Sequence, residues 1–168
     1  MDAEVQAGEG APGEIIALKF HGTLQKHRES VVLPLLLPDL PVIVWWPGRS
    51  PKAPGLDPIG RLANRRITDA MGSSRPLAAI ERRARNYSPG DTDLTWTRLT
   101  PWRALLASAL DSYPAKITGA SVEAGPNNAA SMLLAAWLED RLKVQVESSE
   151  GGKGIGITNV TLHTSKGD

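Results

Sequence analysis

The segment DTDLTWTRLTPWR, at residues 91–103, gathers the side chains best suited to chemistry or recognition, and we call it the Trp/Arg segment. Its two carboxylates, Asp91 and Asp93, could form an acid and base pair of the kind that glycosidases use. No further polar group with a defined role accompanies them, however. Tryptophan and arginine, which also occur twice each in the segment, are enriched at binding hot spots. An ion pair from either aspartate to Arg98 would hold the segment rigid, so the pattern favours binding over catalysis.

The predicted contact surface combines the Trp/Arg segment with a neighbouring apolar strand. That strand, PVIVWW at residues 41–46, ends in two tryptophans that should point to opposite faces, so only one of them can be exposed. For Trp96 and for Trp102, the sequence is equally consistent with a ring in the hydrophobic core and a ring in an interface. The residues that we predict to contact a partner protein are Asp93, Trp96, Arg98, Trp102, Arg103 and Trp46.

A turn further along the chain could hold a small anion. Residues 125–128 (GPNN) follow a predicted strand and precede a predicted helix, where free amides and the helix dipole favour negative charge. Asn127 and Asn128 are the candidate ligands, although the preferred interpretation is that one of them simply caps the helix. The glycine-rich residues 151–156 lead into a strand, so they predict a hairpin turn rather than a phosphate cradle.

Composition and motifs exclude several kinds of chemistry. The sequence has no cysteine, which excludes disulfides, thiolate metal sites and a cysteine nucleophile. Its three histidines, His21, His27 and His163, do not have the spacing of a metal site. A P-loop, a GxGxxG fingerprint and a GxSxG elbow are also absent from the sequence. We therefore expect no catalytic residues, no metal and no cofactor, and we predict that the protein is not an enzyme.

The charge balance gives no indication of a nucleic-acid partner. Lysine and arginine number 19 against 18 aspartates and glutamates, so the formal net charge is only +1. Two groups of arginines could bind phosphates, an acidic partner or nucleic acid, but a solvated surface is the preferred interpretation. These groups are Arg61, Arg65 and Arg66, and Arg82, Arg83 and Arg85.

The hydropathy pattern gives no indication of a membrane. The longest apolar stretch, at residues 31–37, is seven residues long and contains Pro34, whereas a membrane-spanning helix needs about 20. The first residues are acidic and lack the basic and apolar layout of a signal peptide. We predict a cytoplasmic protein.

Strand and helix patterns alternate along most of the chain. Residues 14–20, 41–46 and 117–123 read as strands, and the apolar spacing at residues 100–113 and 129–138 predicts amphipathic helices. Such alternation predicts the α/β class, with a mainly parallel sheet flanked by helices. Two strands near residues 144–146 and 155–163 predict an antiparallel hairpin near the C-terminus. We expect a flexible lead-in at residues 1–13 and a single α/β domain at residues 14–165.

The Trp/Arg segment resembles the signature of a known family. DTDLTWTRLTPWRALL, at residues 91–106, is similar to a string found in the OpcA proteins, the glucose-6-phosphate dehydrogenase assembly proteins. The resemblance extends to residues 29–48 and 57–70. It implies a non-catalytic protein that binds glucose-6-phosphate dehydrogenase and promotes its active assembly, at the entry to the oxidative pentose phosphate pathway.

Two expectations qualify this resemblance. Family members are longer, and we expect that their N-terminal region is absent from this chain. The thiol-linked control known in the cyanobacterial branch does not carry over, because the sequence has no cysteine. The alternative function is a sugar-phosphate-binding sensor or enzyme of carbohydrate metabolism, which would use Asn127, Asn128 and nearby arginines.

Overall fold

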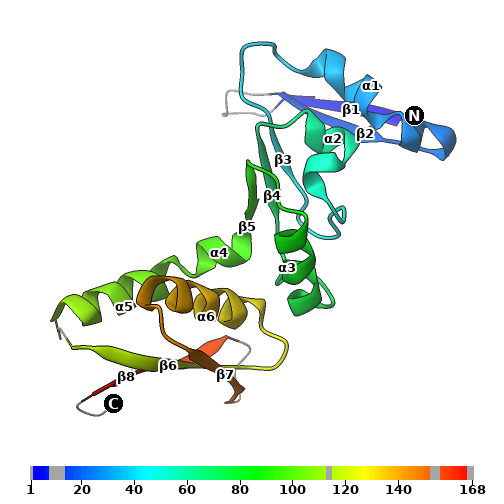
Figure 1. The fold of residues 1–168 in the computed structure, drawn as a ribbon. Coiled ribbons are helices and arrows are strands. Elements are labelled where there is room, and N and C mark those ends of the chain that lie inside the picture. The colour runs from blue at the N-terminus through cyan, green and yellow to red at the C-terminus, as the bar shows by residue number, and fades with distance from the viewer. Residues whose placement is uncertain (1, 8–13, 113–114, 152–155, 166–168) are drawn as a thin grey trace.

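Three small β-sheets organise the chain, and helices flank two of them (Figure 1). The structure is a computed structural model that describes residues 2–7, 14–112, 115–151 and 156–165. One sheet is entirely parallel and another is mixed, with an antiparallel strand near the C-terminus. The predicted α/β class is therefore confirmed, although the strands are distributed over separate sheets.

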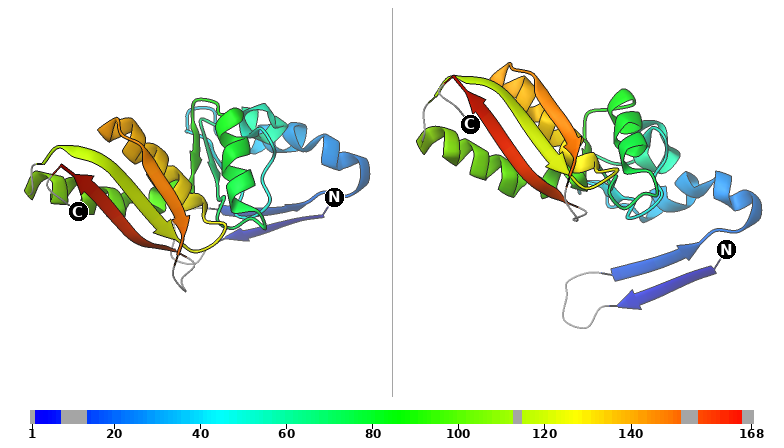
Figure 2. Two further views of the ribbon diagram at one scale, coloured as in Figure 1. Left: turned by 60° about the horizontal axis from the view of Figure 1, so that its bottom comes forward. Right: turned by 90° about the horizontal axis from the view of Figure 1, so that it is seen from below.

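The first sheet is an antiparallel hairpin of β1 (Asp2–Ala7) and β2 (Glu14–Lys19). The sequence predicts a flexible lead-in at residues 1–13, and the structure has a strand at Asp2–Ala7 within it. Residues 8–13 lie outside the described part of the chain. The view from below in Figure 2 shows the hairpin standing apart from the helices.

The second sheet is parallel, in the order β3 (Ile43–Trp45), β4 (Arg65–Thr68) and β5 (Asp91–Asp93). Short helical segments precede β3, and α3 (Pro76–Arg85) connects β4 to β5. The elements around β3 are η1 (Gly22–Lys26), α1 (Arg28–Val32), η2 (Leu33–Leu35), η3 (Pro54–Leu56) and α2 (Pro58–Arg61).

Helix α2 begins as its sequence predicts. The Asp57 side chain accepts hydrogen bonds from the amides of Ile59 and Gly60, and Pro58 occupies the first helical position, where its missing N–H costs nothing. A Cβ on Gly60 would lie only 1.9 Å from the carbonyl oxygen of Pro54. Glycine is therefore required where α2 crosses η3.

The third sheet has the order β7 (Val146–Glu150), β6 (Ile117–Ala124) and β8 (Ile157–Thr164). Helix α6 (Ala129–Leu142) carries the chain from β6 to a parallel β7, which leaves the other edge of β6 for the antiparallel β8. The last two strands were expected to pair with each other, but each pairs with β6 instead.

Helices α5 (Thr100–Ser112) and α6 cover one face of this third sheet (Figures 1 and 2). Alternate residues of β6 are buried beneath them, as the period of two in a strand requires. The short helix α4 (Leu94–Arg98) leads from β5 into α5. The buried residues of the resulting core are Leu99, Leu106, Ala120, Val122, Leu134, Ala135 and Leu138.

Candidate functional site

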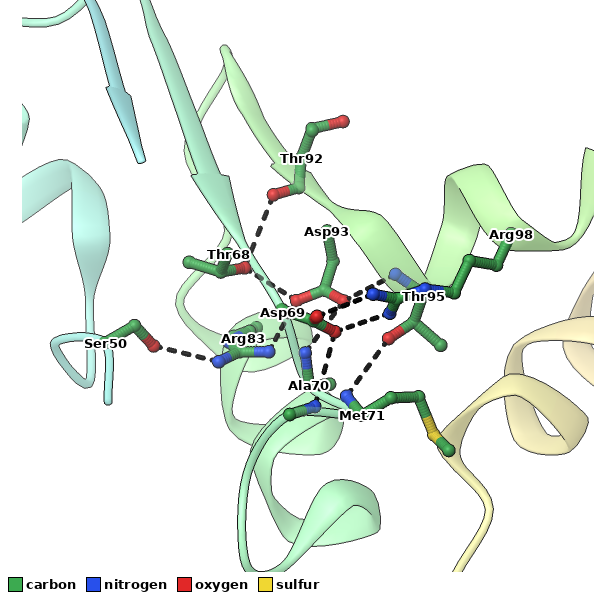
Figure 3. Close-up of polar contacts among 11 residues, drawn as sticks. Ser50, Thr68, Asp69, Ala70, Met71, Arg83, Thr92, Asp93, Thr95 and Arg98 are labelled. Atoms are coloured by element: carbon green, nitrogen blue, oxygen red, sulfur yellow. Dashed lines mark hydrogen bonds and ion pairs between the residues drawn. The ribbon is translucent and has the colours of Figure 1, made fainter. Parts of the chain in front are cut away.

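Asp93, at the end of β5, lies at the centre of a polar network that joins the second sheet to the helices beyond it (Figure 3). One carboxylate oxygen accepts hydrogen bonds from the amides of Ala70 and Thr95, both at 3.0 Å. The other accepts a hydrogen bond of 2.6 Å from the Thr68 hydroxyl and forms an ion pair with Arg83. Only 9% of Asp93 is exposed, so it acts as an internal junction between β4, β5, α3 and α4.

A second ion pair lies beside this junction and is open to solvent. The guanidinium of Arg98 donates to both carboxylate oxygens of Asp69, at 2.6 and 2.7 Å, as Figure 3 shows. Such a two-pronged pair fixes the orientation of both groups. The Arg98 side chain is 51% exposed, whereas Asp69 is buried. The expected ion pair of Arg98 with the Trp/Arg segment's own aspartates is therefore replaced by a pair with Asp69, at the end of β4.

Both buried carboxyls ionise more readily than usual. The hydrogen bond from Arg98 lowers the pKa of Asp69, and this effect outweighs the opposing effect of burial. Burial opposes ionisation of Asp93, but the hydrogen bonds from Thr68, Ala70 and Thr95 together hold its pKa below the ordinary value. Asp69 in turn raises the pKa of Arg98. Both carboxyls therefore favour the ionised form at neutral pH.

The tryptophans of the Trp/Arg segment are attached to the core. Trp96 and Trp102 are partly buried and pack against the cluster that includes Leu99 and Leu106. The Arg103 guanidinium lies 4.0 Å from the centre of the Trp96 ring, within reach of a cation–π interaction. Both rings therefore contribute to the core, and a contact of either with a partner stays a prediction.

The two tryptophans at the end of β3 differ in exposure, as their opposite directions predict. Trp45 is 57% exposed, and Ile43, which shares its face of the strand, is exposed as well. Trp46 is only partly exposed, and its ring lies near Gly60. Trp45 is therefore the more exposed of the two rings, and the contact predicted at Trp46 stays a prediction.

Arg66 is an internal residue that sequence reasoning missed. Only 7% of it is exposed, and its guanidinium pairs with Asp91 and donates to the carbonyl oxygens of Gly60, Ala63 and Pro89. The interpretation of Arg66 as part of a solvated surface is wrong. The period of two in β4 places Arg66 on the same face as Thr68, but nothing in these two polar residues indicates from the sequence that this face is buried.

The turn at residues 125–128 performs the capping role that was preferred for it. The Asn128 side chain accepts hydrogen bonds from the amides of Ala130 and Ser131, at 2.9 and 3.0 Å, and begins α6. Asn127 is exposed and has a positive φ of 56°. The amides that an anion would use are occupied by Asn128, and anion binding at this turn stays a prediction that nothing tests.

Among the described residues, no group of three or more histidine, aspartate or glutamate side chains is placed to hold a metal ion. The same part of the chain contains no helix that is both long and apolar enough to cross a membrane.

Comparison with known proteins finds matches over both halves of the chain. Residues 1–85 match the family model described as the glucose-6-phosphate dehydrogenase subunit N-terminal domain, and residues 89–168 match the corresponding C-terminal domain. The chain belongs to the OpcA family. An OpcA protein of Synechocystis sp., described as a protein of the OxPP cycle, is 30% identical over 142 residues. That alignment covers 77% of this chain but only 29% of the relative, so the chain spans less than a third of the relative's length.

The structure thus separates the predicted contact residues of this OpcA-family chain into two groups. Asp93 is internal, and its four protein partners account for both carboxylate oxygens. Arg98 remains half exposed, and Arg98 and Trp102 line one cavity of about 500 Å³ beside Asp69. The OpcA signature at residues 91–103 therefore has a structural role in holding α4 against β4, whatever else it contacts.

We expect the two buried carboxyls to make the folded protein sensitive to acid. A carboxyl whose pKa is lower in the folded state stabilises the fold above its unfolded pKa, near 3.8, and this stability is lost as the pH falls. The free energy of unfolding in urea, measured from neutral pH downward, should begin to fall near about pH 5 and continue to fall below the unfolded pKa.

Two substitutions separate this effect from general acid sensitivity. Asp69→Asn should reduce the loss of stability over the same pH range, because one contributing group has been removed. Asp140 also has a lowered pKa, owing to its hydrogen bond with Lys143, but it is fully exposed and screened by solvent. Asp140→Asn should leave the pH dependence close to that of the wild type. An equal effect of both substitutions would contradict the assignment to Asp69.

Proposed function

We propose that this chain binds glucose-6-phosphate dehydrogenase and promotes its assembly into the active form, in the oxidative pentose phosphate pathway. The observation that carries the proposal is the match of both halves to domains described as parts of a glucose-6-phosphate dehydrogenase subunit. The description of the Synechocystis relative as an OxPP cycle protein supports the same pathway. Because the chain spans less than a third of that relative, the activity of the longer protein is part of the proposal.

We further propose that the role is non-catalytic. The carboxylates that could have served as acid and base, Asp91 and Asp93, are each held in an ion pair with a largely buried arginine. A general base must be free to reach the proton that it abstracts. Because Asp93 has four protein partners, a structural role is favoured over a role as general base. The cytoplasmic location stays a prediction.

Burial supports Trp45 and Arg98 as the contact residues for the dehydrogenase. Trp45 presents a large ring to solvent beside the exposed Ile43, and Arg98 presents half of a side chain that Asp69 already orients. Tryptophan and arginine with fixed orientation lose little conformational entropy on binding, which is typical of hot-spot residues. Trp96 and Trp102 are poorer test positions, because their truncation would also disturb the core.

We expect Trp45→Ala to weaken the complex with the dehydrogenase about 30-fold, which corresponds to about 2 kcal/mol, because truncation removes a hot-spot ring. Isothermal titration calorimetry gives the affinity, and a titration of dehydrogenase activity with the protein reports assembly. The matched control is Leu105→Ala, which removes another exposed apolar side chain, 62% exposed, from α5.

The outcomes of this titration are distinct. Loss of affinity with Trp45→Ala and retention with Leu105→Ala support the β3 surface as the contact. Equal affinity for both variants and the wild type would move the contact elsewhere on the chain. If the wild-type chain neither binds the dehydrogenase nor changes its substrate saturation, the proposed function itself is wrong for this chain.

A further inference from the structure

The loops that follow β3 and β4 line a cavity together with α3. Its volume is about 730 Å³, and residues 48–52, residues 72–75 and one face of α3 line it. Ligands of α/β proteins bind characteristically outside the carboxyl ends of parallel strands, which is where these two loops begin. The volume also lies within the range of about 300–1,000 Å³ that is usual for small-molecule sites.

The charge of the cavity lining is entirely positive. Five cationic side chains and no carboxylate line it, and the cations are Arg49, Lys52, Arg75, Arg82 and Arg83. Within the described part of the chain, only Arg83 among them forms an ion pair. The nearby carboxylates, Asp69 and Asp93, are already bound to Arg98 and Arg83. Four of the cations that line the cavity therefore form no ion pair with any described residue.

Hydrogen-bond donors in the cavity are also left without partners. The Ser73 hydroxyl is buried and has no hydrogen-bond partner among the described residues. Arg83 donates a hydrogen bond of 2.9 Å to the Ser50 hydroxyl, which ties the first loop to α3 and fixes one wall. Helix α3 begins at Pro76 without a side-chain cap, and the first amides of a helix have no acceptor within the helix.

We propose that this cavity binds a phosphorylated small molecule. A phosphoryl group carries negative charge and several acceptor oxygens. It could therefore pair with the four unpaired cations and accept hydrogen bonds from the Ser73 hydroxyl and the first amides of α3. Arginine is suited to this group because its guanidinium donates two parallel hydrogen bonds to it. No aromatic side chain lines the cavity, so the stacking platforms of a single-strand nucleic-acid site are missing from it.

The test is a calorimetric titration of the 168-residue chain with inorganic pyrophosphate, a hexose phosphate and the unphosphorylated hexose. We expect saturable binding of pyrophosphate and hexose phosphate and none of the hexose. The double variant Arg49→Ala/Arg75→Ala should weaken pyrophosphate binding at least about tenfold, because two charge-assisted hydrogen-bond donors are lost. Both side chains are exposed, so the variant should keep the wild-type unfolding midpoint.

The matched control is Arg61→Ala/Arg65→Ala, which removes two exposed arginines outside the cavity and changes the net charge equally. Retained pyrophosphate binding in this control supports the cavity as the site. Equal weakening in both double variants would show a general electrostatic effect and overturn the proposal, as would the absence of saturable binding to the wild type. A third outcome also overturns the proposal. If the wild-type chain binds neither pyrophosphate nor hexose phosphate, and the Arg49→Ala/Arg75→Ala variant no longer binds the dehydrogenase, the cations contact that protein and not a phosphate. Since the titration needs no dehydrogenase, its result is independent of the proposed function.

Discussion

Asp93→Ala should lower the free energy of unfolding by about 3–5 kcal/mol, the usual cost of removing one partner from a buried ion pair. The substitution strands Arg83, whose side chain is largely buried, and leaves the amides of Ala70 and Thr95 without their acceptor. The lost hydrogen bond to the Thr95 amide is also the N-cap of α4. Urea unfolding at neutral pH, followed by circular dichroism, measures the change.

The controls for this substitution distinguish the junction from a general effect of losing an aspartate. Asp111→Ala removes an exposed carboxylate from α5 and should change the stability by no more than about 0.5 kcal/mol. In an Asp93→Asn/Arg83→Met double variant, the buried positive charge is gone, so the cost should be smaller than the sum of the two single changes. Additive costs would show that the two side chains do not depend on each other.

Arg66→Ala should destabilise the fold by a similar amount, about 3–5 kcal/mol. Its removal leaves Asp91 without its ion-pair partner and leaves the carbonyl oxygens of Gly60, Ala63 and Pro89 without a donor. Because these groups lie on two separate segments, residues 60–63 and 89–91, we expect the urea unfolding transition to shift as a whole. The measurement is again the free energy of unfolding in urea.

Two further variants make the Arg66 prediction specific. Arg66→Lys keeps the charge but cannot donate in four directions at once, so most of the destabilisation should remain. Arg65→Ala removes the preceding arginine, which is exposed, and should leave the stability nearly unchanged. A full rescue by lysine would show that the fold requires only the positive charge, and not the hydrogen bonds to residues 60–63 and 89–91.

Local signals in the sequence predicted most of the elements correctly. The apolar spacing of α5 and α6, the β-branched run of β3 and the Asp57–Pro58 start of α2 are all properties of neighbouring residues, so they can be read without the fold. The antiparallel strand near the C-terminus was also expected. Its partner was not, because pairing with β6 depends on where the α6 crossover returns β7.

The internal polar residues could not be predicted in the same way. Residues 60–63 supply two of the carbonyl acceptors of Arg66. The third carbonyl and the carboxylate come from Pro89 and Asp91, which are 23 and 25 residues away. Arg83 and Asp93 meet only because α3 packs beside β5. In each case, partners from other segments of the chain offset the cost of burying the charge. The residues next to a buried charge in the sequence do not reveal those partners. The same limit made Asp93 look like a surface contact.

The form of strand β3 restricts how a partner can use its exposed face. The strand lies at the edge of its sheet, is only three residues long, and has Pro41 and Pro47 on either side. Flanking prolines and a short length both hinder an edge strand from pairing with a further strand. Main-chain augmentation of this sheet by a partner would therefore form too few hydrogen bonds to hold it, and recognition at this edge has to proceed through the side chains of Ile43 and Trp45.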